Sequence, residues 1–329
     1  MVDVLKVMRS EAGSVLPAEP APFAPARKSV GSAGRRCDTP PVLLTPLPGA
    51  DRQSLLSLLQ ERANEAGNLR NRLDQLPPFQ TFYQYLEWAR FGVQALSARV
   101  RPLEASAMFQ TRRWELLLGV GTDHDIARLL MTQELDDRAV VLKAAYEDLK
   151  AEFERWTTPA RLLVFDTVVY MEHPQKLEEL DFWGLTGEIN RGIHLVVPIA
   201  VIDELDNLKN RGHEAKKWRA AYSLAVLDRV ISGKKKNVAG AVYGHVLRAA
   251  TRSTGDGPAL ERGPVTIDLL LDPPDHVRLP NTDDEIVDRA VNVQALAGKP
   301  VTLVSYDTGM IMRARNAGLD VIKLVQAKD

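Results

Sequence analysis

The stretch "RLLVFDTVVY", residues 161–170, decides how the second half of the chain is interpreted. Its first five residues have the composition of a buried β-strand, and Asp166 follows where that strand ends. A single Asp at this place most often caps the next helix or turn. It is also the place where an α/β protein puts a ligand-binding carboxylate. The rest of the sequence has to distinguish between these two roles.

Bulk properties limit the class of protein. The chain has 329 residues, of which 45% are apolar, and this suits one large domain or two ordinary ones. The single cysteine, Cys37, rules out an intrachain disulfide, and we expect a reducing, cytoplasmic location. The sequence contains no run of about 18 apolar residues, so we expect no membrane span. The start of the chain does not resemble a signal peptide. The formal net charge is −1, so nucleic-acid binding would need a local basic patch.

The chain divides into three predicted regions. Residues 1–50 hold eight of the 20 prolines and show no periodicity, so we expect a disordered tail. Residues 51–158 form a predicted helical region, because apolar side chains recur at spacings of four and three, most clearly from Leu135 to Trp156. Three such heptads suit a coiled-coil seam or the core of a small bundle, and we favour the bundle.

Residues 159–329 have an α/β pattern. Strands are predicted at 161–165, 194–198, 265–271, 300–305 and 320–325, and most are separated by helical segments. Strands that alternate with helices indicate crossover connections and a mostly parallel sheet flanked by helices. The ligand site of such a sheet lies beyond the carboxyl ends of its strands.

Four acidic residues occupy that edge of the predicted sheet. Asp166 and Asp307 follow strands, Glu204 lies early on the helix after the second strand, and Asp283 opens a later helix. Each one alone is more often a cap or a solvated helix residue. Asp284 is turned about 100° from Asp283 on the helix and is the alternative register.

Together, these four side chains predict a metal site. Crowded carboxylates repel one another and take up protons unless a cation neutralises them, and carboxylate oxygens suit Mg²⁺ or Mn²⁺. We therefore expect the four acids to lie about 4–8 Å apart and to share one or two ions. A metal-bound water at such a site would hydrolyse a phosphodiester without a protein nucleophile.

The order of these acids resembles that of the PIN-domain family of metal-dependent ribonucleases, especially its larger members. The family's first block is similar to "LLVFDT" and its second to "VPIAVIDELDNL". Its third block is similar to Asp283 with Ile286 and Ala290, and its fourth to "VTLVSYD", with Ser305 at the hydroxyl position. The resemblance covers about half the chain. It implies catalytic and metal-binding roles for the four acids, with Thr167 and Ser305 in support.

The resemblance also implies single-stranded RNA as the substrate. Local support comes from two groups of basic residues: Lys216, Lys217 and Arg219 beside Trp218, which suit phosphate contact and base stacking, and the run Lys234, Lys235 and Lys236. The alternative is that Lys216 and Lys217 form a solvated helix face and Trp218 belongs to the core.

Other chemistries fit less well. A haloacid-dehalogenase-type phosphatase needs a second acid where this chain has Val168. One Cys and six scattered His predict no zinc cluster, and no Gly-x-Ser-x-Gly elbow is present. The second hypothesis is a catalytically silent PIN-type module that binds RNA or protein, with the helical region as the surface for a protein partner.

Overall fold

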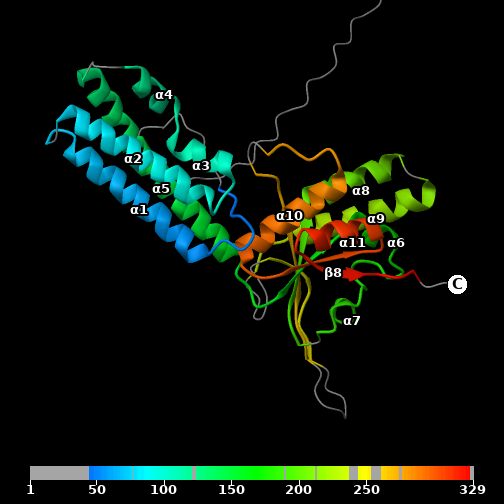
Figure 1. Cartoon of the computed structure of the whole chain (residues 1–329). Helices are drawn as coiled ribbons and strands as arrows, with labels where there is room; N and C mark the ends of the chain where they lie inside the picture. Colours follow the sequence, from blue (N-terminus) through cyan, green and yellow to red (C-terminus); the bar gives the residue numbers. More distant parts are fainter. Residues whose placement is uncertain are drawn as a thin grey trace, which may run out of the picture. The chain divides into compact units, whose positions relative to one another are not determined.

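The computed structural model describes residues 44–326 except 76, 121–123, 189, 212, 237–243, 253–260 and 274–275 (Figure 1). Most of the predicted tail therefore lies outside the described residues. The last part of that segment, residues 44–50, packs on the helical region instead. Leu44 is buried, and the backbone N–H of Thr45 donates to a carboxylate oxygen of Glu104 at 2.6 Å. The predicted boundaries of the three regions remain predictions.

The first half of the described chain is helical. It comprises α1 (Arg52–Arg72), α2 (Pro78–Ser97), α3 (Pro102–Phe109), α4 (Arg112–Gly119) and α5 (His124–Trp156). Prolines open α2 and α3, where the missing N–H would have no partner inside the helix. The long helix α5 contacts each of the other four, which is the packing of a bundle. Its predicted apolar stripe supplies the core through Leu135, Leu142, Leu149 and Phe153.

The second half contains a six-stranded sheet in the order β3-β6-β2-β1-β7-β8. The strands are β1 (Arg161–Phe165), β2 (Ile193–Pro198), β3 (His245–Arg248), β6 (Val265–Leu270), β7 (Val301–Ser305) and β8 (Asp320–Lys323). All neighbours pair in parallel except β3, which pairs antiparallel with β6. The predicted mostly parallel sheet is confirmed, and the strands that compose it all come from residues 161–323.

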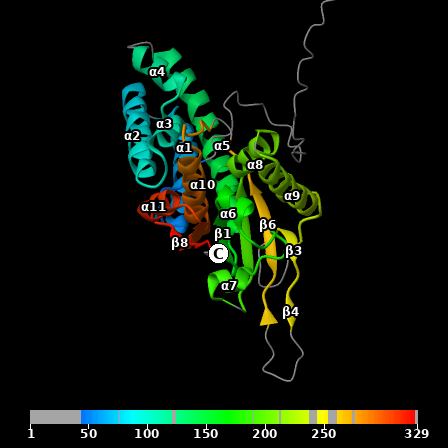
Figure 2. The same cartoon turned by 90° about the vertical axis from the view of Figure 1, so that its right-hand side faces the viewer.

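Helices surround this sheet (Figure 2). They are α6 (Thr167–Glu172), α7 (Phe182–Thr186), α8 (Ile199–Arg211), α9 (Glu214–Ile231), α10 (Thr282–Ala297) and α11 (Thr308–Asn316). α10 contacts β2 and β7, and it ends at Gly298, whose positive φ of 62° suits glycine. The sequence did not predict α6, α7 or β3. It also missed the separate hairpin of β4 (Thr251–Arg252) and β5 (Glu261–Arg262).

The strand order fixes where a ligand site forms. The chain passes from β1 to β2 on one side and later returns to place β7 on the other side of β1. The order therefore reverses between β1 and β7, and a crevice opens beyond the carboxyl ends of two such strands. Asp166 follows β1 and Asp307 follows β7, so both flank this switch point.

Candidate metal centre

Asp166 is held at the switch point by the neighbouring strand. Its side chain is buried, and its Oδ2 accepts a hydrogen bond from the Ser305 hydroxyl at 2.6 Å. The same hydroxyl oxygen accepts the backbone N–H of Asp307 at 2.8 Å. One serine therefore links the ends of β1 and β7 and fixes the orientation of the first carboxylate.

Glu204 reaches the same place from α8. Its Oε2 accepts a hydrogen bond from the Thr167 hydroxyl at 2.7 Å, and Thr167 is the residue after Asp166. α8 begins directly after β2, the neighbour of β1, so the second turn of the helix stands beside the end of β1. Both hydroxyl residues named by the resemblance thus contact one of the four acids.

The electrostatics of Asp166 show which charges face it. Burial, and after it the negative charges of Asp283 and Glu204, raise the pKa of its carboxyl group to about 6. The Ser305 hydrogen bond acts in the opposite direction, because it stabilises the ionised form. Carboxylates from three separate segments therefore act on one another, with no cation among the causes of the shift.

Asp283 and Asp284 occupy the first turn of α10, and both contact Arg313 of α11. The guanidinium lies 3.3 Å from Asp283 Oδ2 and 3.0 Å from Asp284 Oδ1. Of these two acids, only Asp283 has a charge that contributes to the raised pKa of Asp166. Asp284 is also the more exposed of the two, in the direction expected from its position on the helix.

Asp307 is exposed and caps α11. Its Oδ1 accepts the backbone N–H groups of Gly309 and Met310. The carboxylate therefore caps the helix, which was the alternative role expected for it from the sequence. Its second oxygen, Oδ2, takes no part in the cap.

The four acids do not form a tight cluster. Within the described part of the chain, no three of them place one ligand atom each within 4.8 Å of one another. Each carboxylate instead has a partner in the protein: a hydroxyl for Asp166 and Glu204, Arg313 for Asp283, and the cap for Asp307. The predicted spacing of about 4–8 Å remains a prediction. The donor set, all carboxylate oxygens around a buried acid of raised pKa, fits a hard divalent cation such as Mg²⁺ or Mn²⁺.

The predicted nucleic-acid surface is centred on α9. Trp218 is 57% exposed and stacks on Tyr222 at 5.6 Å between ring centroids, so it does not belong to the core. The ammonium group of Lys176 lies over both rings. The guanidinium of Arg219 instead donates to three backbone carbonyls of the segment 170–175, which is a structural role.

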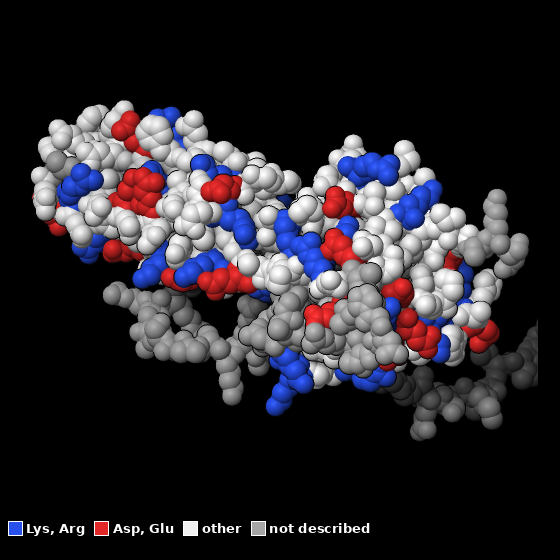
Figure 3. Space-filling view, turned by 90° about the horizontal axis from the view of Figure 1, so that it is seen from below, with Lys and Arg blue, Asp and Glu red and all other residues white. Residues whose placement is uncertain are grey.

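The predicted lysines are in varied surroundings. Lys217 pairs with Glu214, and Lys235 lies 2.7 Å from the buried carboxylate of Asp268. Lys216, Lys234 and Lys236 are exposed. On the face seen in Figure 3, basic and acidic side chains are interspersed over the described surface, as the near-zero net charge implies. RNA contact by the six basic residues remains a prediction.

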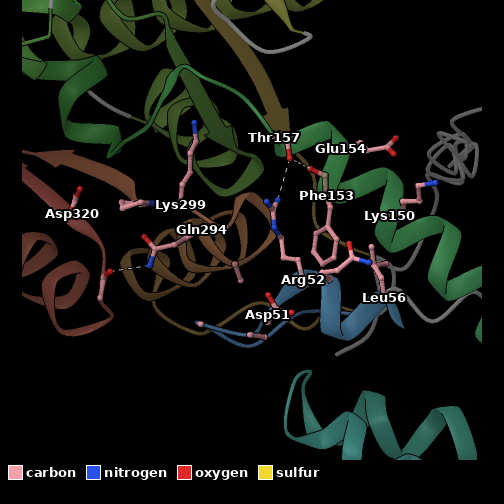
Figure 4. Close-up of a pocket in the computed structure, with 17 residues that line it drawn as sticks. Asp51, Arg52, Leu56, Lys150, Phe153, Glu154, Thr157, Gln294, Lys299 and Asp320 are labelled. Carbon is pink, nitrogen blue, oxygen red and sulfur yellow. Dashed lines mark hydrogen bonds between the residues drawn. The ribbon is translucent and has the colours of Figure 1, made fainter. Parts of the chain in front are cut away.

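A cavity of about 850 Å³ lies away from the four acids (Figure 4). It is lined by the start of α1, the end of α5 and the turn between α10 and β7. Arg52 donates there to the carbonyl of Leu296 at 3.1 Å and to the hydroxyl of Thr157 at 3.3 Å. The first bond joins α1 to α10 and the second joins α1 to the residue after α5, so we assign the cavity a structural and not a catalytic role.

One side-chain cluster was not predicted from the sequence. Ligand atoms of Asp272, His276 and Glu285 lie within 4.8 Å of one another, although the scattered histidines had predicted no such group. Patterns of Cys and His alone do not reveal it, because this cluster combines one His with two acids. Its irregular spacing gives no recognisable motif.

Comparison with known proteins identifies a family for the second half of the chain. Residues 163–324 match the model of a protein family described as PIN domain. No curated protein matches the chain. Among the described residues, no helix has the length and apolar character needed to cross a bilayer.

Proposed function

The C-terminal half of the chain is a PIN domain, and from this premise we propose that the protein is a metal-dependent endoribonuclease acting on single-stranded RNA. PIN domains are typically nucleases, so the general class is a hydrolase acting on phosphodiester bonds. The observation that carries the finer proposal is the pair of acids at the switch point: Asp166 is buried and held by the Ser305 hydroxyl, and Glu204 is held beside it by the Thr167 hydroxyl. Burial and the charges of Asp283 and Glu204 raise the pKa of Asp166, and a divalent cation would offset that effect.

Asp166, Glu204, Asp283 and Asp307 are the proposed ligands. Asp166 would bind in its ionised form, oriented by the Ser305 hydroxyl. Thr167 would orient Glu204 in the same way. Asp283 would have to exchange its contact with Arg313 for the ion, while Arg313 keeps Asp284. When bound, Mg²⁺ or Mn²⁺ supplies a water of lowered pKa and neutralises negative charge on the phosphate.

The exposed rings of α9 support RNA as the substrate. Bases stack on aromatic faces without needing a defined sequence, and each such contact typically contributes about 1–3 kcal/mol. Trp218 offers an exposed face backed by Tyr222, and Lys176 adds a positive charge beside it. This combination suits an unpaired strand better than a duplex, whose bases are already stacked.

The second candidate is a binding module without turnover, and a specific contact favours it. Arg313 already neutralises Asp283, so the cation could be an arginine instead of a metal. Such a module would use the helical region for a protein partner. Exposed aromatic side chains on α2 offer a surface for one: Phe79, Tyr83 and Phe91.

The test is cleavage of end-labelled single-stranded RNA with Mg²⁺ or Mn²⁺ and with a chelator. We expect cleavage only with the metal. Asp166→Asn should reduce the rate on the order of 10²–10³-fold or more, because one charged group of the reacting centre is lost at constant volume. The matched control is Asp284→Asn, which should retain most of the rate. Cleavage that persists in chelator contradicts the proposal, and a protein that cleaves no RNA with either metal supports the binding module.

A further inference from the structure

The cluster of Asp272, His276 and Glu285 lies between the end of β6 and the start of α10. Glu285 is 1% exposed, and its Oε1 lies 2.7 Å from the His276 Nε2. Its Oε2 accepts the backbone N–H of Leu279 at 2.9 Å. The imidazole Nε2 of His276 thus contacts Oε1 of the buried Glu285, while Oε2 is held by the backbone N–H of Leu279.

Asp272 completes the group with one of its two carboxylate oxygens. Its Oδ2 accepts a hydrogen bond from Arg278 Nε at 2.6 Å, whereas its Oδ1 is buried and accepts no hydrogen bond from the residues that the structure describes. A buried carboxylate oxygen of this kind is costly unless something else compensates it. One atom from each of Asp272, His276 and Glu285 lies within 4.8 Å of the others.

Two arginines adjoin the cluster, and each also contacts an acid outside it. Arg278 also donates to Asp203 Oδ2 of α8 at 2.5 Å, and α8 lies beside α10 (Figure 1). The other guanidinium, that of Arg289, has its Nε 3.9 Å from Glu285 and lies 3.7 Å from Asp288, which also pairs with Arg101 at 3.2 Å. These three arginines therefore balance three of the four acids that they contact, and one negative charge is left.

We propose that Asp272, His276 and Glu285 form a second metal site, distinct from the four acids, that takes a divalent cation of the Zn²⁺ class. A neutral imidazole nitrogen with two carboxylate oxygens suits Zn²⁺, at typical distances of about 2.0–2.2 Å. Mg²⁺ fits less well, because it prefers oxygen ligands and retains its waters. The ion would take Asp272 Oδ1, His276 Nε2 and Glu285 Oε1, and a water would fill the fourth position.

The role of this site is structural. The ion would join residues that follow β6 to Glu285 in the first turn of α10, two residues from Asp283. A fixed first turn would hold Asp283 in place relative to the end of β1. The proposal stands on its own contacts and does not require the protein to be a nuclease.

The experiment measures Zn²⁺ binding by the full chain carrying Asp166→Asn, in excess Mg²⁺, so that the four acids contribute little. We expect one tightly bound Zn²⁺ per chain and a melting temperature that rises with Zn²⁺. Adding His276→Asn, or separately Asp272→Asn, should weaken Zn²⁺ binding by at least about tenfold and remove the rise in melting temperature. Co²⁺ in place of Zn²⁺ should give visible absorption that depends on His276.

The matched control is His213→Asn, because His213 is exposed and makes no capping hydrogen bond. It should leave Zn²⁺ binding unchanged, which excludes general binding by histidines. If His276→Asn does not fold, Asp272→Asn decides the question, since it keeps the side-chain volume. Failure of the parent chain to bind Zn²⁺, or unchanged affinity in either folded variant, overturns the proposal.

Discussion

Two buried carboxylates, one in each half of the molecule, are treated very differently. Glu134 of the helical region is fully buried and lies 3.0 Å from Arg113 and 3.3 Å from Arg138. Asp166 of the sheet region is buried to a similar degree, yet its side-chain partner is the neutral hydroxyl of Ser305, and burial together with nearby acids raises its pKa.

The presence or absence of a cationic partner separates a structural buried acid from a functional one. A buried charge is costly unless it is paired, so Glu134 has the pairing expected of a structural acid. Asp268, buried in the sheet region, follows the same rule: hydrogen bonds and charges of Lys235 and Arg155 outweigh burial and lower its pKa. Asp166 is a buried acid with a neutral partner and a raised pKa, and it lies at the topological switch point. A perturbed acid at that place indicates a functional site.

The largest expected effect is at the structural acid. Glu134→Gln should lower the free energy of unfolding by about 3–5 kcal/mol, because the buried guanidinium of Arg138 would lose the negative charge of Glu134. Denaturant unfolding at pH 7.5 measures this loss. A loss under about 1 kcal/mol would show that the ion pairs of the helical region do not stabilise it.

Next in size is the difference between neighbouring acids on α10. Asp283→Asn should reduce RNA cleavage on the order of 10²–10³-fold, because its charge acts on Asp166. Asp284→Asn should change the rate less than about tenfold, because it is more exposed and its charge is not among those that act on Asp166. Steady-state rates of the two variants make the comparison. Equal losses would show that the register between the two residues is wrongly assigned.

Asp166→Asn should stabilise the metal-free protein. The carboxyl pKa rises from 3.8 in the unfolded state to about 6 in the folded state. The folded protein therefore loses stability as the pH rises from 3.8 to about 6, because the unfolded state gives up the proton more easily. The substitution removes this penalty, worth up to about 3 kcal/mol at pH 7.5, and should have no such effect below pH 3.8. Thermal unfolding in chelator at both pH values checks the sign. Destabilisation at pH 7.5 would place Asp166 with the paired, structural acids.

The smallest effect concerns RNA contact on α9. Trp218→Ala should weaken binding of single-stranded RNA by about 1–3 kcal/mol and leave the melting temperature nearly unchanged, because the ring is exposed. Arg219→Ala should lower the melting temperature, because three backbone carbonyls lose their donor. Fluorescence anisotropy and thermal unfolding separate the two roles. If Trp218→Ala leaves the RNA affinity unchanged, the aromatic rings of α9 do not contact RNA.

The sequence predicted the elements that have strong periodicity. Strand β1 and helices α5 and α10 were found from apolar spacing, and the strand–helix alternation gave the parallel sheet. Helices α6 and α7 were missed because they have six and five residues, too few for a period to show. β3 was missed because a short edge strand depends on its partner β6 rather than on its own composition.

The candidate site was less predictable than the fold. The acids could be named from their places after strands, but their partners could not, because Arg313 and Ser305 meet them only in three dimensions. Trp218 shows the same limit: its helical position fits core and surface equally well, and only tertiary packing leaves it exposed. The cluster around Glu285 escaped prediction because its three residues follow no known ligand spacing.

The most direct test of the central claim is Mn²⁺ binding, measured from the electron paramagnetic resonance signal of the free ion. Wild-type protein and Asp284→Asn should both bind Mn²⁺ at pH 7.5. Asp166→Asn should lose at least about tenfold in affinity. Wild-type affinity should also fall as the pH drops below about 6, where Asp166 takes up its proton. Equal Mn²⁺ affinity of the wild-type and Asp166→Asn proteins would show that Asp166 is not a metal ligand.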